Sequence, residues 1–213
     1  KELIRPILRG RDIKRYGYEW ADLWLIATFP SRHYDIEEYP AVKTYLLSFG
    51  IERLEQTGKK YVINGEEVKA RKKTNNKWFE TQDSINYWQD FLKPKIIWKR
   101  VGSILRFGYN DNGALGLDST CFATGKQIEY LCCVLNSPMG HYLLKDSPKT
   151  GTGDLLISVQ AVEPIKVPLI NEEENSKFKN LFKTHQENEI NREVYELYNL
   201  SEEEIKFIMD NYY

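Results

Sequence analysis

The sequence predicts an α+β fold with a mixed, largely antiparallel central sheet, flanking helices and a helical C-terminal appendage. Three observations carry this prediction: hairpin signals in the middle of the chain, apolar residues at helical spacing, and helix-capping pairs near the C-terminus. The length of 213 residues fits one main body. We expect a domain over residues 1–170 and a helical appendage of the same domain over residues 171–213.

The N-terminal part predicts short strands followed by a helix. Residues 5–16 are interrupted by proline and glycine and are dense in cations, which favours loop and short strand. The short apolar run at residues 23–28 favours a buried strand. Pro40 suits a first helical position, and the apolar residues after it recur at helical spacing to about Glu55.

Two hairpins are predicted in the middle of the chain. Asn64–Gly65, between two β-capable arms, is the strongest short hairpin signal in the sequence. A second hairpin is expected over residues 96–107, with Gly102–Ser103 as a two-residue turn. In that register Lys99 faces Arg106. Like charges opposed across strands are destabilising, so an anion such as a phosphate between them would relieve the conflict.

The C-terminal half predicts helices separated by one more strand. Thr124 is a candidate N-cap for a packed helix that bends at Pro138. A glycine-rich turn at residues 150–153 leads to a strand-like stretch that ends at residue 170. Two later helices are expected to begin at cap-x-x-Glu pairs, namely Asn171 with Glu174 and Ser201 with Glu204.

Composition narrows the class of protein. The sequence is 41% hydrophobic and 13% aromatic, which is typical of a soluble globular domain. It contains no run of eighteen apolar residues and no apolar signal core, so we expect a cytoplasmic protein without a membrane partner. The chain begins at lysine without a methionine, and we expect it to be a piece of a longer protein. Cys121, Cys132 and Cys133 show no CxxC spacing and the three histidines lie far apart, so we expect reduced thiols and no metal site.

Motifs for independent catalysis are missing, and we expect no catalytic residue in this chain. A methyltransferase needs a glycine-rich cofactor loop and an NPPY-type motif, to which Asn136–Met139 is the nearest and a poor match. A metal-dependent nuclease usually needs a PD…(D/E)xK arrangement, and the chain has no Pro-Asp pair. One alternative remains a small metal-dependent nuclease that uses an acid–lysine triplet, at residues 12–14 or 67–69. The other is a protein-docking module in which the acidic C-terminal helices meet a methyltransferase subunit.

The distribution of charge and amides favours double-stranded DNA as the partner. Residues 1–110 hold 21 Lys/Arg against 14 Asp/Glu, whereas residues 111–213 hold 9 against 17. Lysine and arginine neutralise phosphates, while arginine and asparagine can also read base edges. We therefore predict target or groove contacts from Arg71, Lys72, Lys73, Asn75, Asn76 and Lys77, and phosphate contacts from Lys99, Arg100 and Arg106.

Several segments, in order, resemble one known family. They are RPILRGRDIKRY at the start, YPAVKTYLLSF, Trp78-Phe79-Glu80, Lys93-Pro94-Lys95-Ile96-Ile97, Asp118 to Phe122, YLCCVLNSPMGHYLLK, IKVPLI and VYELYNLSEEEI. Together they resemble the TaqI-like C-terminal specificity domains of fused type II restriction-modification enzymes and adenine-specific DNA methyltransferases. The segment from about Gly58 to Lys77 has no fixed counterpart in the family pattern, and such variable segments are where we expect target choice to be encoded.

The resemblance implies a DNA target-recognition domain whose catalytic partners lie elsewhere in the parent polypeptide. An adenine-N6 methyltransferase domain would precede it, in some members after a nuclease domain. The two domains would clamp duplex DNA while the methyltransferase flips the adenine. No cofactor is implied for this chain. S-adenosylmethionine is implied for the parent enzyme, and Mg where a nuclease is fused.

Overall fold

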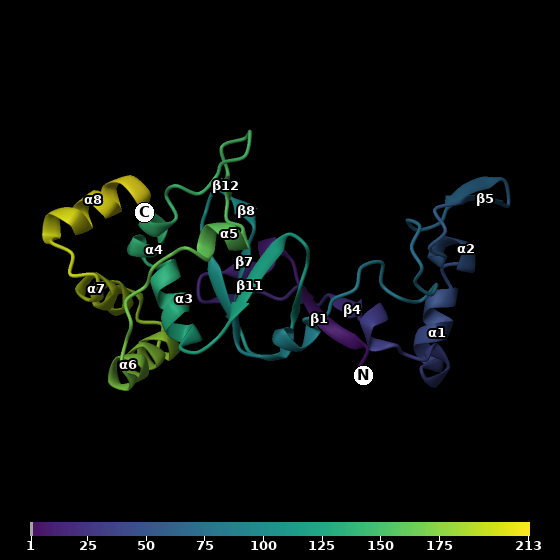
Figure 1. Cartoon of the computed structure of the whole chain (residues 1–213), viewed down its shortest axis with the longest axis horizontal. Helices are drawn as coiled ribbons and strands as arrows, with labels where there is room; N and C mark the ends of the chain where they lie inside the picture. Colours follow the sequence, from purple (N-terminus) through teal and green to yellow (C-terminus); the bar gives the residue numbers. More distant parts are fainter. Residues whose placement is uncertain (1) are drawn as a thin grey trace. The chain divides into compact units, whose positions relative to one another are not determined.

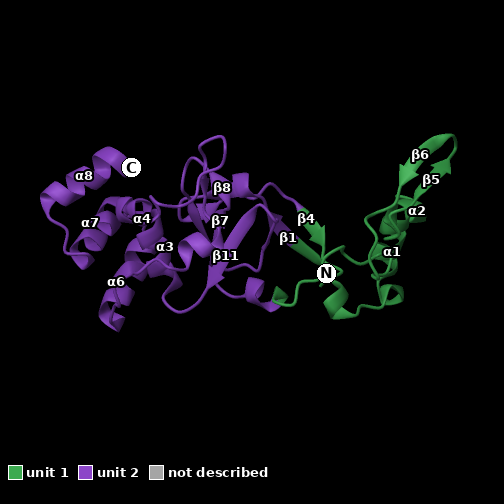
Figure 2. Ribbon diagram, turned by 45° about the horizontal axis from the view of Figure 1, so that its top comes forward, with its two compact units in different colours: residues 1–5, 24–88 green, residues 6–23, 89–213 purple. Residues whose placement is uncertain are grey.

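The computed structural model describes residues 2–213, which divide into two compact units (Figure 2). Unit 1 holds the chain up to Arg5 together with Trp24–Trp88, and unit 2 holds Pro6–Leu23 together with Gln89–Tyr213. The predicted α+β class is confirmed, but the strands form several small sheets rather than one central sheet. The predicted division at residue 170 stays a prediction. No helix in residues 2–213 has the length and apolarity of a membrane span.

Unit 1 is made of short elements (Figure 1). They are the start of β1 (Ile4–Leu8), β4 (Trp24–Ile26), α1 (Pro40–Leu47), α2 (Ile51–Leu54), β5 (Lys60–Ile63) and β6 (Glu66–Lys69), with 3-10 turns at Pro30–Arg32 and Ile36–Glu38. Pro40 is the first helical residue, as expected. The single helix predicted to reach Glu55 is wrong, because Gly50 adopts a φ of +87° and separates α1 from α2. A strand does form at residues 24–26, but it is not buried: Trp24 is 54% exposed.

The predicted Asn64–Gly65 hairpin is confirmed. β5 and β6 pair antiparallel with Ile63 opposite Glu66, which leaves Asn64–Gly65 as a two-residue turn. The φ angles of Asn64 and Gly65 are +52° and +84°, both in the left-handed region. Asn-Gly favours this turn because asparagine and glycine reach the left-handed region at low cost, and its twist matches that of the two strands.

Unit 2 contains the main sheet and most helices. Its strands are the rest of β1, β2 (Ile13–Lys14), β3 (Gly17–Tyr18), β7 (Lys95–Lys99), β8 (Val101–Gly102), β9 (Phe107–Asn110), β10 (Leu115–Gly116), β11 (Thr120–Thr124) and β12 (Leu155–Leu156). Its helices are α3 (Ile128–Asn136), α4 (Pro138–Leu143), α5 (Val159–Val162), α6 (Glu172–Lys183), α7 (Glu187–Leu197) and α8 (Glu202–Tyr212). The three-stranded sheet has the order β11-β7-β9 and is antiparallel, while β1 pairs with β10 in parallel.

The core of unit 2 lies between this sheet and α3. Successive side chains of a strand point to opposite faces of the sheet, and the first four residues of β7 are all buried. Ile96 and Trp98 join the large cluster formed with α3, α6 and α7, whereas Ile97 belongs to a smaller cluster with Leu8 and Ile13. The strand is therefore covered on both faces. This double cover explains the three consecutive apolar residues at its centre, Ile96, Ile97 and Trp98.

The second predicted hairpin is partly wrong. β7 and β9 pair with Trp98 opposite Phe107, which is the predicted register. The tight turn at Gly102–Ser103 does not form, because Val101 and Gly102 pair instead with β12. The ladder therefore ends at Trp98, and the next residue in that register, Lys99, lies beyond it.

The helical predictions hold better at the C-terminus than in the middle. Thr124 is not an N-cap but the last residue of β11, and α3 starts at Ile128 after Gln127 in the left-handed region. The bend at Pro138 is a break between helices, where the Ser137 side chain accepts from the Gly140 amide and caps α4. The predicted strand to residue 170 shrinks to β12, followed by α5. Both predicted capping boxes form, at the starts of α6 and α8.

Candidate nucleic-acid interface

Six of the nine predicted contact residues lie on one ordered loop of unit 1, residues 70–82, which follows β6. The side chain of Gln56 is 5% exposed and forms hydrogen bonds to this loop. Its Nε2 donates to the carbonyls of Lys77 (3.1 Å) and Glu80 (2.9 Å), and its Oε1 accepts from the Thr74 hydroxyl (2.7 Å). A backbone bond from Thr74 N to Gln56 O adds to these contacts (3.0 Å). Gln56, which follows α2, therefore fixes the position of the loop through several hydrogen bonds.

Arg71, predicted as a groove contact, is half-buried and bound to backbone carbonyls of the loop and of α2. Its Nε donates to the Leu54 carbonyl (2.8 Å), Nη1 donates to the Glu80 carbonyl (2.9 Å), and Nη2 donates to the Trp78 carbonyl. Burial lowers the pKa of its guanidinium from the ordinary value. The contacts favour a positioning role for Arg71 over base reading.

Asn76 is engaged in the same way. Its Nδ2 donates to the carbonyls of Thr81 (3.1 Å) and Gln82 (2.9 Å), which uses both amide hydrogens. A bidentate contact to adenine would need one of these hydrogens together with Oδ1. Asn76 therefore shapes the loop in this conformation. The other four predicted residues of the loop, Lys72, Lys73, Asn75 and Lys77, are all exposed.

The adjacent hairpin presents a mixed face. Lys60 lies opposite Lys69 and Val62 lies opposite Glu67, and since directly opposed residues share a face, all four side chains project together. Lys60 Nζ is 2.8 Å from Glu67 Oε1. Glu66 and Glu67 lie near the tip of the hairpin, where carboxylates would repel DNA phosphates. The ion pair with Lys60 offsets the charge of Glu67.

In unit 2, two of the three predicted phosphate contacts line one cavity of about 250 Å³. Lys99 at the end of β7 and Arg106 just before β9 both line it, together with Gly102 and Ser103 from the open tip of the hairpin that connects these two strands. Arg11, from the 3-10 turn Gly10–Asp12, is a third cation in its wall. Arg100 is exposed but does not line this cavity. Arg11 was not among the predicted contacts, since proximity of residues 11, 99 and 106 arises only from folding.

The turn that carries Arg11 is held by an ion pair. Arg9 Nη2 lies 2.8 Å from Asp12 Oδ1, and Arg9 Nε also bonds the same carboxylate. Asp12 is 4% exposed and also accepts from the Arg9 amide (2.8 Å). Arg9 holds the pKa of the Asp12 carboxyl below its ordinary value, mainly through the side-chain hydrogen bond.

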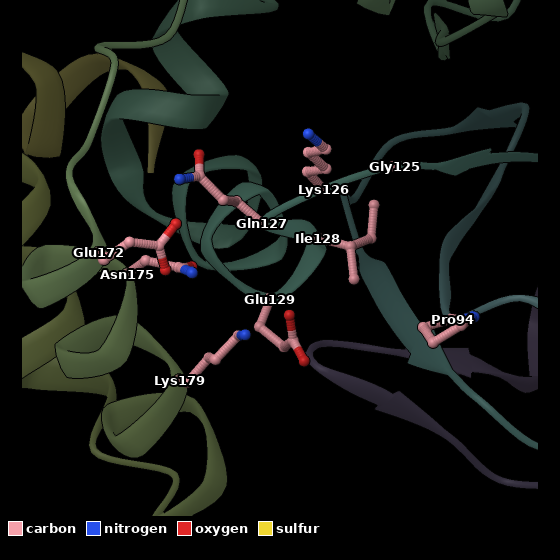
Figure 3. Close-up of a pocket in the computed structure, with 9 residues that line it drawn as sticks. All are labelled: Pro94, Gly125, Lys126, Gln127, Ile128, Glu129, Glu172, Asn175 and Lys179. Carbon is pink, nitrogen blue, oxygen red and sulfur yellow. The ribbon is translucent and has the colours of Figure 1, made fainter.

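A second cavity in unit 2, of about 390 Å³, has a different chemistry (Figure 3). It lies at the starts of α3 and α6. Lys126 and Lys179 line it, but so do Glu129 and Glu172, and Figure 3 shows Lys179 pointing toward Glu129. Two carboxylates offset the two ammonium groups, so this cavity is poorly suited to a polyanion.

The acid–lysine triplets weighed for a nuclease are engaged otherwise. Asp12 is buried in its ion pair with Arg9, and Glu67 is paired with Lys60 on the hairpin. Within residues 2–213 no three His, Cys, Asp or Glu side chains come together as a metal site would require. All three cysteines are free, with Cys132 and Cys133 buried in the core of unit 2.

Comparison with known families matches residues 5–159 to the TaqI-like C-terminal specificity domain. A comparison with curated proteins found no match. The matched range covers most of the chain and includes the loop, the hairpin and all three cations of the basic cavity. Such a domain gives restriction-modification enzymes their DNA sequence specificity. The chain belongs to the family of TaqI-like C-terminal specificity domains.

Proposed function

We propose that this domain reads a duplex DNA sequence for a restriction-modification enzyme whose catalytic domain is an adenine-N6 methyltransferase, with or without a fused endonuclease. One observation carries the reading role: an ordered loop in unit 1 exposes Lys72, Lys73, Asn75 and Lys77 beside a two-stranded ribbon. A two-stranded ribbon fits the major groove, where each base pair presents a distinct pattern of donors and acceptors.

The loop and the ribbon supply different parts of recognition. The lysines would neutralise phosphates, which gives affinity without sequence information. Asn75, exposed and outside the loop's own hydrogen bonds, is the side chain best placed to address an adenine edge. Arg71 and Asn76 then act by fixing the shape of the loop, through five bonds to backbone carbonyls.

Catalysis is assigned to other domains of the parent protein. S-adenosylmethionine does not fit this chain, because the sequence has no glycine-rich loop between a strand and a helix. Mg does not fit either, since the acids of both candidate triplets in residues 2–213 are already paired with cations. We therefore expect the isolated chain neither to methylate nor to cut DNA. Methyl transfer or metal-dependent nicking that survives rigorous purification would contradict this assignment.

Binding of the isolated chain to duplex DNA tests the DNA-binding role. We expect a dissociation constant of roughly 10⁻⁴ to 10⁻⁶ M, because phosphate contacts alone give that range. Each contact changes the logarithmic salt slope by about −0.9, so four to six contacts would give a slope of roughly −4 to −5. Binding that is absent at low salt, or independent of salt, would count against the role.

Exchange of residues 58–77 in the full-length enzyme tests where sequence is read. We expect the recognised sequence to change, and exchange of the terminal helices to leave it unaltered. Replacing Asn75 should relax the requirement at particular base pairs by roughly 1–3 kcal/mol each. An unchanged target motif in methylome sequencing, with normal activity, would place target reading elsewhere.

A further inference from the structure

The cavity between the 3-10 turn Gly10–Asp12 and the opened hairpin is lined by three cationic side chains and no acidic one. Arg11, Lys99 and Arg106 come from three different segments of unit 2. None of the three forms an ion pair with a carboxylate in residues 2–213. Like charges gathered around one cavity repel one another, so this arrangement costs stability unless an anion offsets it.

We propose that this cavity is a socket for a single phosphate group, gripped jointly by Arg11, Lys99 and Arg106. This inference rests on the proposed function in taking that group to be one phosphodiester of the DNA backbone. The same chemistry would accept a free inorganic phosphate. Arg11 thereby becomes a binding residue, and Arg100 does not belong to the socket.

The surrounding backbone is built to hold these cations in place. A Cβ on Gly10 would lie 2.8 Å from Lys99 Cγ, so the lysine stem packs directly on the glycine. A Cβ on Gly102 would lie 3.7 Å from Lys99 Nζ, which places the ammonium beside the backbone of β8. β8 pairs with β12 and the ladder of β7 with β9 ends at Trp98 and Phe107, so Lys99 and Arg106 are not paired across the hairpin where the cavity lies. The ion pair of Arg9 with Asp12 fixes the turn that carries Arg11.

The size and chemistry of the cavity fit one oxyanion. Its volume of about 250 Å³ exceeds the ~30 Å³ of one water molecule several-fold, which is room for a tetrahedral group of five heavy atoms with hydration. A guanidinium offers a planar fork of donors and an ammonium offers a point charge, and both are common phosphate ligands. Ser103 also lines the cavity, and a serine hydroxyl is a neutral donor.

The first experiment uses the 213-residue chain and inorganic phosphate. A titration followed by ¹H–¹⁵N spectra should shift the amide signals of Gly10, Arg11, Gly102 and Ser103, with saturation. The triple variant Arg11→Gln/Lys99→Gln/Arg106→Gln, shown to be folded by its urea unfolding midpoint, should lose these shifts. Absence of localised shifts in the unaltered chain, or the same shifts in the folded variant, would overturn the socket.

The second experiment counts phosphates through the salt dependence of duplex binding. Three cations that grip one phosphate contribute about 0.9 to the slope together, whereas three that meet separate phosphates contribute about 2.7. The triple variant should therefore lower the magnitude of the slope by about 0.9. The matched control is Lys72→Gln/Lys73→Gln/Lys77→Gln, which removes the same charge from the exposed loop and should lower it by up to about 2.7.

The two experiments separate the socket from the proposed function. If the unaltered chain binds duplex with a steep salt slope but the cavity variant lowers it by about 2.7 or not at all, the single-phosphate socket is wrong and the DNA-binding role stands. If duplex binding is absent while phosphate titrates the cavity, the socket stands for a free anion and the DNA-binding role fails.

Discussion

Gln56→Leu should loosen the recognition loop without altering the charge of the domain. The side chain keeps a similar size but loses its amide. Three hydrogen bonds disappear, to the Lys77 and Glu80 carbonyls and from the Thr74 hydroxyl. The Glu80 carbonyl retains its bond from Arg71, so the losses fall on Lys77 and Thr74. Because Gln56 is 5% exposed, water replaces these partners poorly.

The expected magnitude follows from the bonds that are lost. At about 1 kcal/mol for each of three hydrogen bonds, the free energy of opening the loop should fall by roughly 3 kcal/mol. That change corresponds to about a hundredfold faster amide exchange in residues 70–82, measured by hydrogen–deuterium exchange. Gln160→Leu, at an exposed position of α5, is the matched control and should leave exchange in the loop unchanged.

DNA binding by this variant should separate non-specific affinity for duplex DNA from sequence preference. Since Lys72, Lys73 and Lys77 keep their charges, Gln56→Leu should bind mixed-sequence duplex with the salt slope of the unaltered chain. Its preference for duplexes selected from a random pool should shrink, because the loop no longer presents its side chains in one geometry. Wild-type exchange in the loop together with wild-type sequence preference would show that Gln56 does not position this site.

Three further predictions concern stability and pH. Burial lowers the pKa of Lys95, 0% exposed, to about 8, so the unfolded state binds the extra proton and the free energy of unfolding should rise with pH. Relative to Lys95→Met, in urea unfolding, the gain from pH 7 to 9.5 should be about 2 kcal/mol, and a constant difference would refute this cause. A Cβ on Gly108 would overlap the Gly17 carbonyl oxygen, so Gly108→Ala should destabilise unit 2 by at least about 1–3 kcal/mol. The control Gly125→Ala has open space around the new Cβ and should leave stability unchanged. Equal thermal midpoints for the two variants would contradict the packing argument. Ser201→Ala removes the side-chain cap of α8 and should cost about 1 kcal/mol in urea unfolding, against no measurable change for the exposed Ser84→Ala.

Several elements of the fold are encoded in local sequence. Asn64–Gly65 forms the predicted turn because its backbone preference is intrinsic to those two residues. Asn171 and Ser201 cap their helices as predicted, since a capping box depends only on a suitable N-cap side chain and a glutamate three residues later. The family could also be recognised from ordered sequence segments, and the match over residues 5–159 confirms it.

The site depended more on folding than these elements did. Arg71 and Asn76 look like groove contacts in sequence, but the carbonyls that engage them become partners only when the loop folds back on itself and onto α2. Asn75 and the loop lysines have no such partner among the hydrogen bonds that hold the loop, and they stay exposed. A list of cations and amides cannot distinguish these two groups, because the difference lies in which backbone atoms surround each side chain.

The sequence by itself determined the α+β class, the Asn64–Gly65 turn and the caps of α6 and α8, because these depend on composition or on residues within four positions of one another. Only the tertiary structure decided that the second hairpin is open at its tip, because β8 pairs with β12, more than fifty residues later in the chain. That long-range pairing places Lys99 and Arg106 around one cavity with Arg11. The edge of a strand pairs with the backbone that the tertiary fold places next to it. The local preference of Gly102–Ser103 for a two-residue turn is too small to outweigh the pairing of β8 with β12.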